Sequence, residues 1–95
     1  MNITISAIRC ALQVALLGSI TPNLRAINTN LKENTVELYF YYETPPSEEE
    51  EELSEIVVTE IYADFIDISI NIHRIVLSLS DKIPEIGLRI FHRKE

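Results

Sequence analysis

The segment PPSEEEEELSEIVVTEIYADF, residues 45–65, predicts one long helix in the middle of the chain. Its two prolines end the element before them, because proline cannot donate a hydrogen bond to a sheet. Ser47, followed three residues later by Glu50, has the pattern of a capping box at a helix start. Apolar residues then recur at helical spacing until residues 64–65. We expect the inward stripe to contain Leu53, Ile56, Val57, Phe65 and either Tyr62 or Ile61.

The residues before this helix, TPNLRAINTNLKENTVELYFYYE at 21–43, predict a β-hairpin with its loop at residues 32–34. β-branched and aromatic side chains are typical of strands, and successive side chains of a strand point to opposite faces. One face of the second strand therefore carries Val36, Leu38, Phe40 and Tyr42. The opposite face carries Glu37, Tyr39, Tyr41 and Glu43.

The first residues predict a helix over residues 4–17 that ends at Gly18, a residue suited to a C-terminal cap. Apolar residues surround most of this helix, so we expect it to be largely buried, with Cys10 as a core thiol. The segment lacks the cationic start of a signal peptide, and its apolar run is shorter than the about 20 residues of a transmembrane helix. We interpret it as a buried helix of a cytoplasmic protein, and the lone cysteine agrees with a reducing compartment.

The last third of the chain predicts two further strands. Residues 66–79 alternate apolar and polar side chains, but the apolar positions change phase between Ile72 and Ile75. Because a period of two cannot shift by one without a bulge or turn, we place an irregularity at His73–Arg74. A loop at residues 81–85 and a strand at residues 86–93 follow.

Together these elements predict an α+β fold with the order α-β-β-α-β-β in a single domain, residues 1–95. The simplest arrangement is a mainly antiparallel four-stranded sheet with both helices packed on one face. The opposite face of such a sheet can be partly solvated.

Charge is distributed unevenly along the chain, whose net charge is −7. No lysine or arginine lies between Lys32 and Arg74, and twelve acidic residues fill that interval. Such a chain should repel nucleic acid and anionic membranes, so we expect neither as a partner. A cationic protein surface is the natural complement.

Candidate catalytic and metal-binding residues are scarce. The two histidines and one cysteine lack the paired spacing of a metal site. No nucleophile elbow occurs, and two glycines cannot build a phosphate-binding loop. Successive glutamates at a helix start point in directions about 100° apart, so they cannot all converge on one pocket. We therefore expect no catalytic residue, no metal and no cofactor, and we interpret the chain as a non-enzyme.

Two features are candidate partner-binding surfaces. Five glutamates at the helix start exceed what capping requires, and like charges four residues apart repel each other. The alternative is a solvated face that only caps the helix. Tyrosines flanked by carboxylates suit an interface. The alternatives for them are a second layer that covers them, a role that only supports the strand, or the interface of a homodimer. The candidate partner-binding residues are Glu37, Tyr39, Tyr41, Glu43, Glu48, Glu49, Glu51, Glu52 and Glu55.

Three segments, together with a basic C-terminal strand, carry a family resemblance: ALLGSITPNLRAI, LYFYYE and SEEEEELSEIVVTEIYADF. Through them, most of the chain resembles small bacterial immunity proteins. The proteins it resembles are immunity proteins of contact-dependent growth inhibition systems and related polymorphic toxins. This resemblance implies a protein without enzyme activity that binds a cognate toxin domain, commonly a nuclease, and blocks its active site or substrate path. It carries no functional residue over to this chain.

We therefore expect a non-catalytic inhibitor that neutralises a basic toxin domain through the acidic and tyrosine residues. A nuclease is the expected toxin, because its cleft must attract phosphate and carboxylates can take the place of phosphates. Two alternatives stay open. One is a structural or adaptor domain that self-associates through its open sheet face, and the other is a small enzyme with a cationic substrate.

Overall fold

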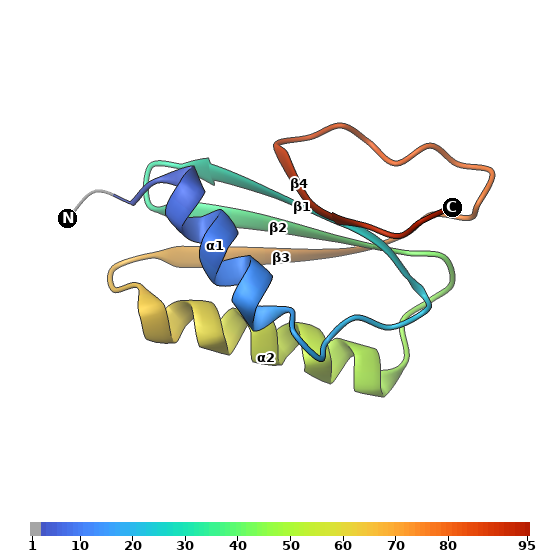
Figure 1. The fold of residues 1–95 in the computed structure, drawn as a ribbon, viewed down its shortest axis with the longest axis horizontal. Coiled ribbons are helices and arrows are strands. Elements are labelled where there is room, and N and C mark those ends of the chain that lie inside the picture. The colour runs from blue at the N-terminus through green and yellow to red at the C-terminus, as the bar shows by residue number, and fades with distance from the viewer. Residues whose placement is uncertain (1–2) are drawn as a thin grey trace.

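A computed structural model of the protein describes residues 3–95, which form two helices and four strands (Figure 1). The elements are α1 (Ile5–Ala15), β1 (Leu24–Lys32), β2 (Thr35–Tyr42), α2 (Glu48–Asp64), β3 (Ser69–Val76) and β4 (Leu88–His92). The predicted order α-β-β-α-β-β and the α+β class are therefore confirmed.

The four strands form one mixed sheet in the order β3-β2-β1-β4. The β1–β2 and β1–β4 pairs are antiparallel, whereas β2 and β3 are parallel. A parallel pair needs a crossover connection, and α2 supplies it between β2 and β3. The sheet is thus mainly antiparallel, as predicted, with one β-α-β unit at its β3 edge.

The β1–β2 hairpin is closed by a two-residue loop, Glu33–Asn34, next to the last pair of the two strands. Glu33 has a φ of 57°, and positive φ in such loops matches the twist of the flanking strands. The register shifts between Leu24 and Ala26. Because of this shift, Leu24 packs on one side of the sheet and Ala26 on the other.

One face of the sheet carries both helices, and the main hydrophobic core lies between the two layers, with α1 drawn in front of the sheet in Figure 1. Inward residues of α1 and α2 recur every three to four positions, as expected for amphipathic helices. Alternate residues of β2 face the helices, as predicted. The buried members of this core are Ile8, Leu12, Ala15, Leu16, Leu24, Ile27, Val36, Leu38, Phe40, Tyr42, Val57 and Ile61.

The opposite face of the sheet is partly covered by the connection between β3 and β4, residues 77–87, which we call the strap. Ile83 of the strap packs with Ala26 and Tyr41 in a second, smaller buried cluster. Three partly buried side chains border this cluster: Tyr39, Ile75 and Leu77. The strap therefore covers only part of this side of the sheet.

Strand β3 corrects one sequence prediction. The irregularity expected at His73–Arg74 is wrong, because β3 pairs with β2 without a break from Ser69 to Val76. Ile70 and Ile72 pack on the helix-side core, whereas Ile75 packs on the second cluster. The apolar phase changes because the covered face of the strand changes along its length.

The connection after β3 is longer, and the final strand shorter, than predicted. The loop expected at residues 81–85 extends over residues 77–87, and β4 begins at Leu88 instead of residue 86. Gly87 lies where the strap meets β4, with a φ of 65°. A Cβ at this position would clash with the carbonyl oxygen of Thr29, so only glycine fits there without a shift of the backbone.

The outer sides of both helices also differ from expectation. The prediction that α1 is largely buried is wrong, because Cys10 and Val14 are exposed. Ile56 was expected in the inward stripe of α2 but is exposed, and of the two alternatives Tyr62 and Ile61 it is Ile61 that is buried. Each helix turns only one side to the sheet, and within residues 3–95 no further layer covers the other side.

Candidate partner-binding surfaces

The start of α2 is built around Glu50, whose carboxylate is turned inward. Ser47 Oγ accepts a hydrogen bond from the Glu50 amide at 3.2 Å, and the Ser47 amide donates to Glu50 Oε1 at 3.1 Å, so the predicted capping box is present. Thr21 and Asn23 donate to the same carboxylate at 2.6 and 3.2 Å. Burial acts to raise the pKa of Glu50, but these hydrogen bonds outweigh it and hold the pKa below its usual value. Glu50 therefore has a structural role at the start of α2.

The other four glutamates of the run lack such contacts. Glu48, Glu49, Glu51 and Glu52 are exposed, and none of them forms an ion pair with any residue of 3–95. Glu48, Glu49 and Glu51 lie in the first turn of α2, where the positive end of the helix dipole favours a carboxylate. Glu48 and Glu52 are four residues apart and repel each other. We call these four residues the free acidic run.

Glu55, further along α2, is already paired. Arg74 of β3 donates from Nη2 to Glu55 Oε1 at 2.6 Å and from Nε to Ser54 Oγ at 3.0 Å. The Glu55 side chain stays 62% exposed, and surface pairs of this kind contribute at most about 1 kcal/mol. Sequence reasoning did not identify the role of Arg74. One indication of this role was present in the sequence: Arg74 is the first basic residue after the long acidic interval.

The uncovered part of the other sheet face carries a polar cluster around Glu37 and Tyr39. Asn71 Nδ2 donates to Glu37 Oε2 at 2.8 Å, and His73 Nε2 lies 3.1 Å from Glu37 Oε1. The Tyr39 ring stacks on the His73 ring, with their centres 4.8 Å apart. Two hydrogen bonds hold the pKa of Glu37 below its usual value: the one from Asn71 has the larger effect, and the one from His73 the smaller. Asn71 and His73 were not among the predicted site residues.

Tyr41 lies on the same sheet face but is not accessible. It is fully buried beneath the strap, and burial raises the pKa of its hydroxyl group. The hydroxyl oxygen has no hydrogen-bond partner among the described residues. The sequence left open that a second layer covers these tyrosines. The strap is such a layer for Tyr41, and only Tyr39 of the pair reaches the surface.

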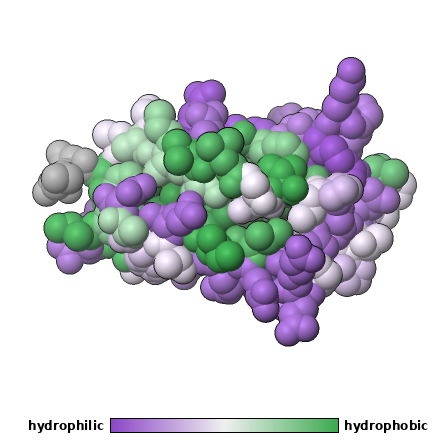
Figure 2. Space-filling view, turned by 60° about the horizontal axis from the view of Figure 1, so that its bottom comes forward, coloured by the Kyte–Doolittle hydropathy of each residue, from purple (hydrophilic) through white to green (hydrophobic). Residues whose placement is uncertain are grey.

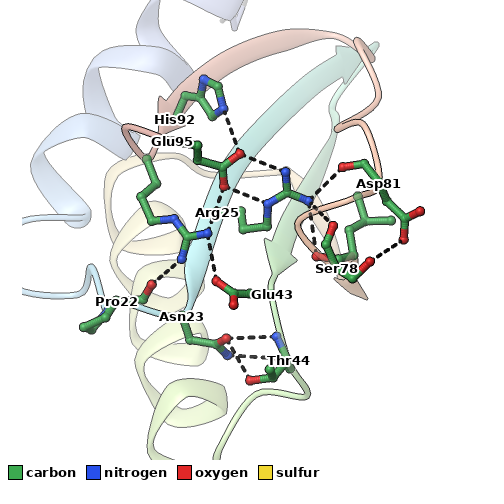
Figure 3. A network of polar contacts seen from close by, with 11 residues as sticks. Pro22, Asn23, Arg25, Glu43, Thr44, Ser78, Asp81, His92 and Glu95 are labelled. Carbon is green, nitrogen blue, oxygen red and sulfur yellow. Dashed lines mark hydrogen bonds and ion pairs between the residues drawn. The ribbon is translucent and has the colours of Figure 1, made fainter.

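Glu43, at the end of β2, belongs to a network of ion pairs (Figure 3). Arg93 Nη2 lies 2.9 Å from Glu43 Oε1 and 2.9 Å from Glu95 Oε2. Glu95 also pairs with the buried Arg25 at 2.7 Å. The charge of Glu43 is thus balanced within the chain, which leaves it less available to a partner.

The predicted partner-binding residues do not form one continuous surface. Glu37 and Tyr39 lie on the sheet face turned away from the helices. The free acidic run and Glu55 lie on α2, in the helix layer. Only the free acidic run combines exposure with unbalanced charge, so it is the strongest of the predicted candidates.

Within residues 3–95, no group of three or more histidine, cysteine, aspartate or glutamate side chains is arranged to hold a metal ion. In the same part of the chain, neither helix combines the length and the apolar character needed to cross a membrane.

Comparison with protein families identifies the group to which this chain is related. The model of a family described as MafI2 immunity protein matches residues 5–95. The chain therefore belongs to the MafI2 immunity protein family, and the resemblance to bacterial immunity proteins is confirmed. A comparison with curated protein sequences gave no match. Membership of this family supports an immunity role, which implies a cognate toxin as the partner.

Proposed function

We propose that this member of the MafI2 immunity protein family is a non-catalytic inhibitor that binds the cationic surface of a nuclease toxin domain. The observation that carries the proposal is the free acidic run, Glu48, Glu49, Glu51 and Glu52, which has no ion-pair partner within residues 3–95. A cationic partner would relieve the repulsion within this run. The immunity role itself follows from the family.

The chemistry of the acidic run favours a nuclease over other toxins. A nuclease attracts the phosphates of its substrate with lysine and arginine side chains. Carboxylates held at a helix start can occupy the positions of such phosphates and exclude the substrate. A nuclease acts on nucleic acid inside the cell, so the inhibitor would work in the cytoplasm.

Contacts within the chain rank the remaining candidate residues. Glu55 borders the acidic run and can contribute if Arg74 yields to a partner cation. Glu37 and Glu43 already have partners within the chain, so we assign them a secondary role in binding. The partly buried ring of Tyr39 has the same secondary role. Tyr41 is excluded by its burial.

The test starts with co-expression of this chain and the toxin domain encoded immediately upstream of it. Cell growth reports neutralisation, and size exclusion of the purified mixture at low and high salt reports a complex. Growth rescue with a stable 1:1 complex is the expected result. A harmless neighbour, or a chain that elutes only with itself, contradicts the proposal.

A charge variant then tests the acidic run. We expect Glu48→Gln, Glu49→Gln, Glu51→Gln and Glu52→Gln together to slow association about tenfold or more at low salt, because charge steering mainly affects association rates. The salt dependence of the association rate should flatten as well. The matched control changes four other exposed acids: Glu33→Gln, Asp64→Asn, Asp67→Asn and Glu85→Gln. Equal rates for the two variants would show that net charge matters and the acidic run does not.

A further inference from the structure

Several large apolar side chains are exposed on the helix layer beside the free acidic run. Val14 and Leu17, at the end of α1 and just beyond it, are 68% and 78% exposed. Ile20, in the turn that follows, is 41% exposed, and Ile56 of α2 is 49% exposed. We call these four residues the apolar patch. Figure 2 shows apolar groups gathered in the middle of this face of the molecule, with hydrophilic groups around them.

The fold brings the members of the apolar patch to one face. Val14 lies in the last turn of α1 and Leu17 directly follows the C-cap residue Leu16, and α1 packs against α2. Leu53 of α2 lines a small cavity together with Ser19 and Thr21, which places the turn after α1 against the first turns of α2. Ile56 follows Leu53 by three residues, so it lies on the same side of α2 as that turn.

The apolar patch is bordered by part of the free acidic run. Glu49 precedes Leu53 by four residues and Glu52 precedes Ile56 by four, so both carboxylates lie along the same side of α2. Specific interfaces have an apolar centre with a polar rim. Exposed apolar patches with a polar border are typical of protein interaction sites. The helix layer has this composition, and the part of its border that α2 supplies carries the carboxylates of Glu49 and Glu52.

We propose that the apolar patch is the centre of the surface that docks the toxin domain. This inference rests on the proposed function, and it identifies the surface through which the chain would bind the toxin domain. The charge of the border defines the partner surface, which is apolar at its centre and edged by lysine or arginine side chains that meet Glu49 and Glu52. The carboxylates steer the encounter, and burial of the apolar patch keeps the complex together.

The two parts of this surface make separable contributions to the kinetics. Removal of charges at the border mainly changes the association rate and its salt dependence. Removal of apolar area at the centre mainly changes the dissociation rate, as most interface substitutions do. Apolar variants should therefore accelerate dissociation and leave the salt dependence of association unchanged.

The experiment measures binding of this chain to the immobilised, catalytically inactive toxin domain encoded immediately upstream. The test variant is Val14→Thr with Leu17→Gln, which removes apolar area and keeps side chains of similar size. The matched control is Leu79→Gln with Ile86→Gln, since these strap residues are also exposed, at 59% and 42%, but belong to the connection that crosses the other sheet face. Thermal unfolding of each variant verifies that it is folded.

We expect the test variant to dissociate about tenfold faster or more, and the control to dissociate within about twofold of the unchanged chain. If the unchanged chain binds and the test variant dissociates at the same rate, the docking surface lies elsewhere and the proposed function still stands. If the unchanged chain does not bind the toxin domain, both proposals fall. If the unchanged chain instead forms a homodimer that the test variant abolishes, a second copy covers the apolar patch and the docking proposal is overturned.

Discussion

The Arg25 guanidinium group and the Glu95 carboxylate form a two-point ion pair, with Arg25 Nε 2.7 Å from Glu95 Oε2 and Nη2 2.8 Å from Oε1 (Figure 3). The third nitrogen of Arg25, Nη1, donates to three carbonyl oxygens at the start of the strap, those of Leu77, Ser78 and Asp81. Arg25 is only 3% exposed. One buried side chain thus joins β1, the strap and Glu95.

Arg25→Ala should destabilise the protein and loosen the strap. We expect the free energy of unfolding to fall by about 2–3 kcal/mol. This is below the roughly 3–5 kcal/mol for breaking a fully buried pair, because Glu95 remains partly in water. Urea denaturation measures the loss, and hydrogen exchange should show faster exchange in residues 77–87. Arg9→Ala is the control, since Arg9 is exposed and forms no ion pair within residues 3–95. Equal stability of the two variants would contradict the role given to Arg25.

The same ion pair predicts how stability depends on pH. Hydrogen bonds from Arg25 and, to a smaller extent, from Arg93 lower the pKa of Glu95 from 4.5 to about 2. The folded state therefore binds fewer protons than the unfolded chain between these two values. Stability from this group is fully present above about pH 5 and is lost as the pH falls toward 2. Urea midpoints should show a gap between the unchanged protein and Glu95→Gln that shrinks over this range. A gap that stays constant from pH 7 to pH 2 would refute the assignment.

The two glycines of the chain should respond differently to alanine. Gly87 and Gly18 both have positive φ, 65° and 81°, so alanine strains the backbone at either position. At Gly87 the new Cβ would also meet the Thr29 carbonyl oxygen, whereas at Gly18 nothing lies within 4 Å. We expect Gly18→Ala to cost about 1 kcal/mol and Gly87→Ala clearly more, measured as free energies of unfolding. A smaller loss at Gly87 would show that the strap and β4 adjust freely.

Tyr41→Phe should leave stability unchanged or raise it by up to about 1 kcal/mol. The buried hydroxyl of Tyr41 has no hydrogen-bond partner among the described residues, so its removal relieves a desolvation cost. Tyr62→Phe is the matched control, because the Tyr62 hydroxyl accepts a hydrogen bond from the Ile70 amide at 3.0 Å. That control should lose roughly 0.5–1.5 kcal/mol. A marked loss of stability in Tyr41→Phe would indicate a partner for its hydroxyl, such as a buried water.

Local sequence patterns were sufficient to predict the helices, the hairpin and the order of the elements. The capping box at Ser47, the prolines before it and the alternation along β2 each act over a few residues. Their meaning therefore does not depend on distant parts of the chain. The same holds for the excess of glutamate at the start of α2, which was visible without any structure.

The candidate surfaces could be predicted only in part. The sequence does not distinguish Glu50 from its neighbours, because the inward turn of its carboxylate depends on Thr21 and Asn23, 29 and 27 residues away. Tyr39 and Tyr41 have the same pattern along β2, yet the strap buries one and leaves the other at the surface. The apolar patch was missed because Val14, Leu17 and Ile56 fit helical stripes that could equally have faced a core.

Residue types and their spacing specified which segments are helices and strands, and where negative charge accumulates. The three-dimensional fold specified which charges are neutralised and which apolar sides are covered. Arg25 and Glu95 are 70 residues apart, and Ile83 reaches Tyr41 only because the strap crosses the sheet. Local hydrogen-bonding and steric preferences act between neighbours along the chain, whereas burial depends on which distant segments meet. The helix layer that we propose as the docking surface is exposed for that reason.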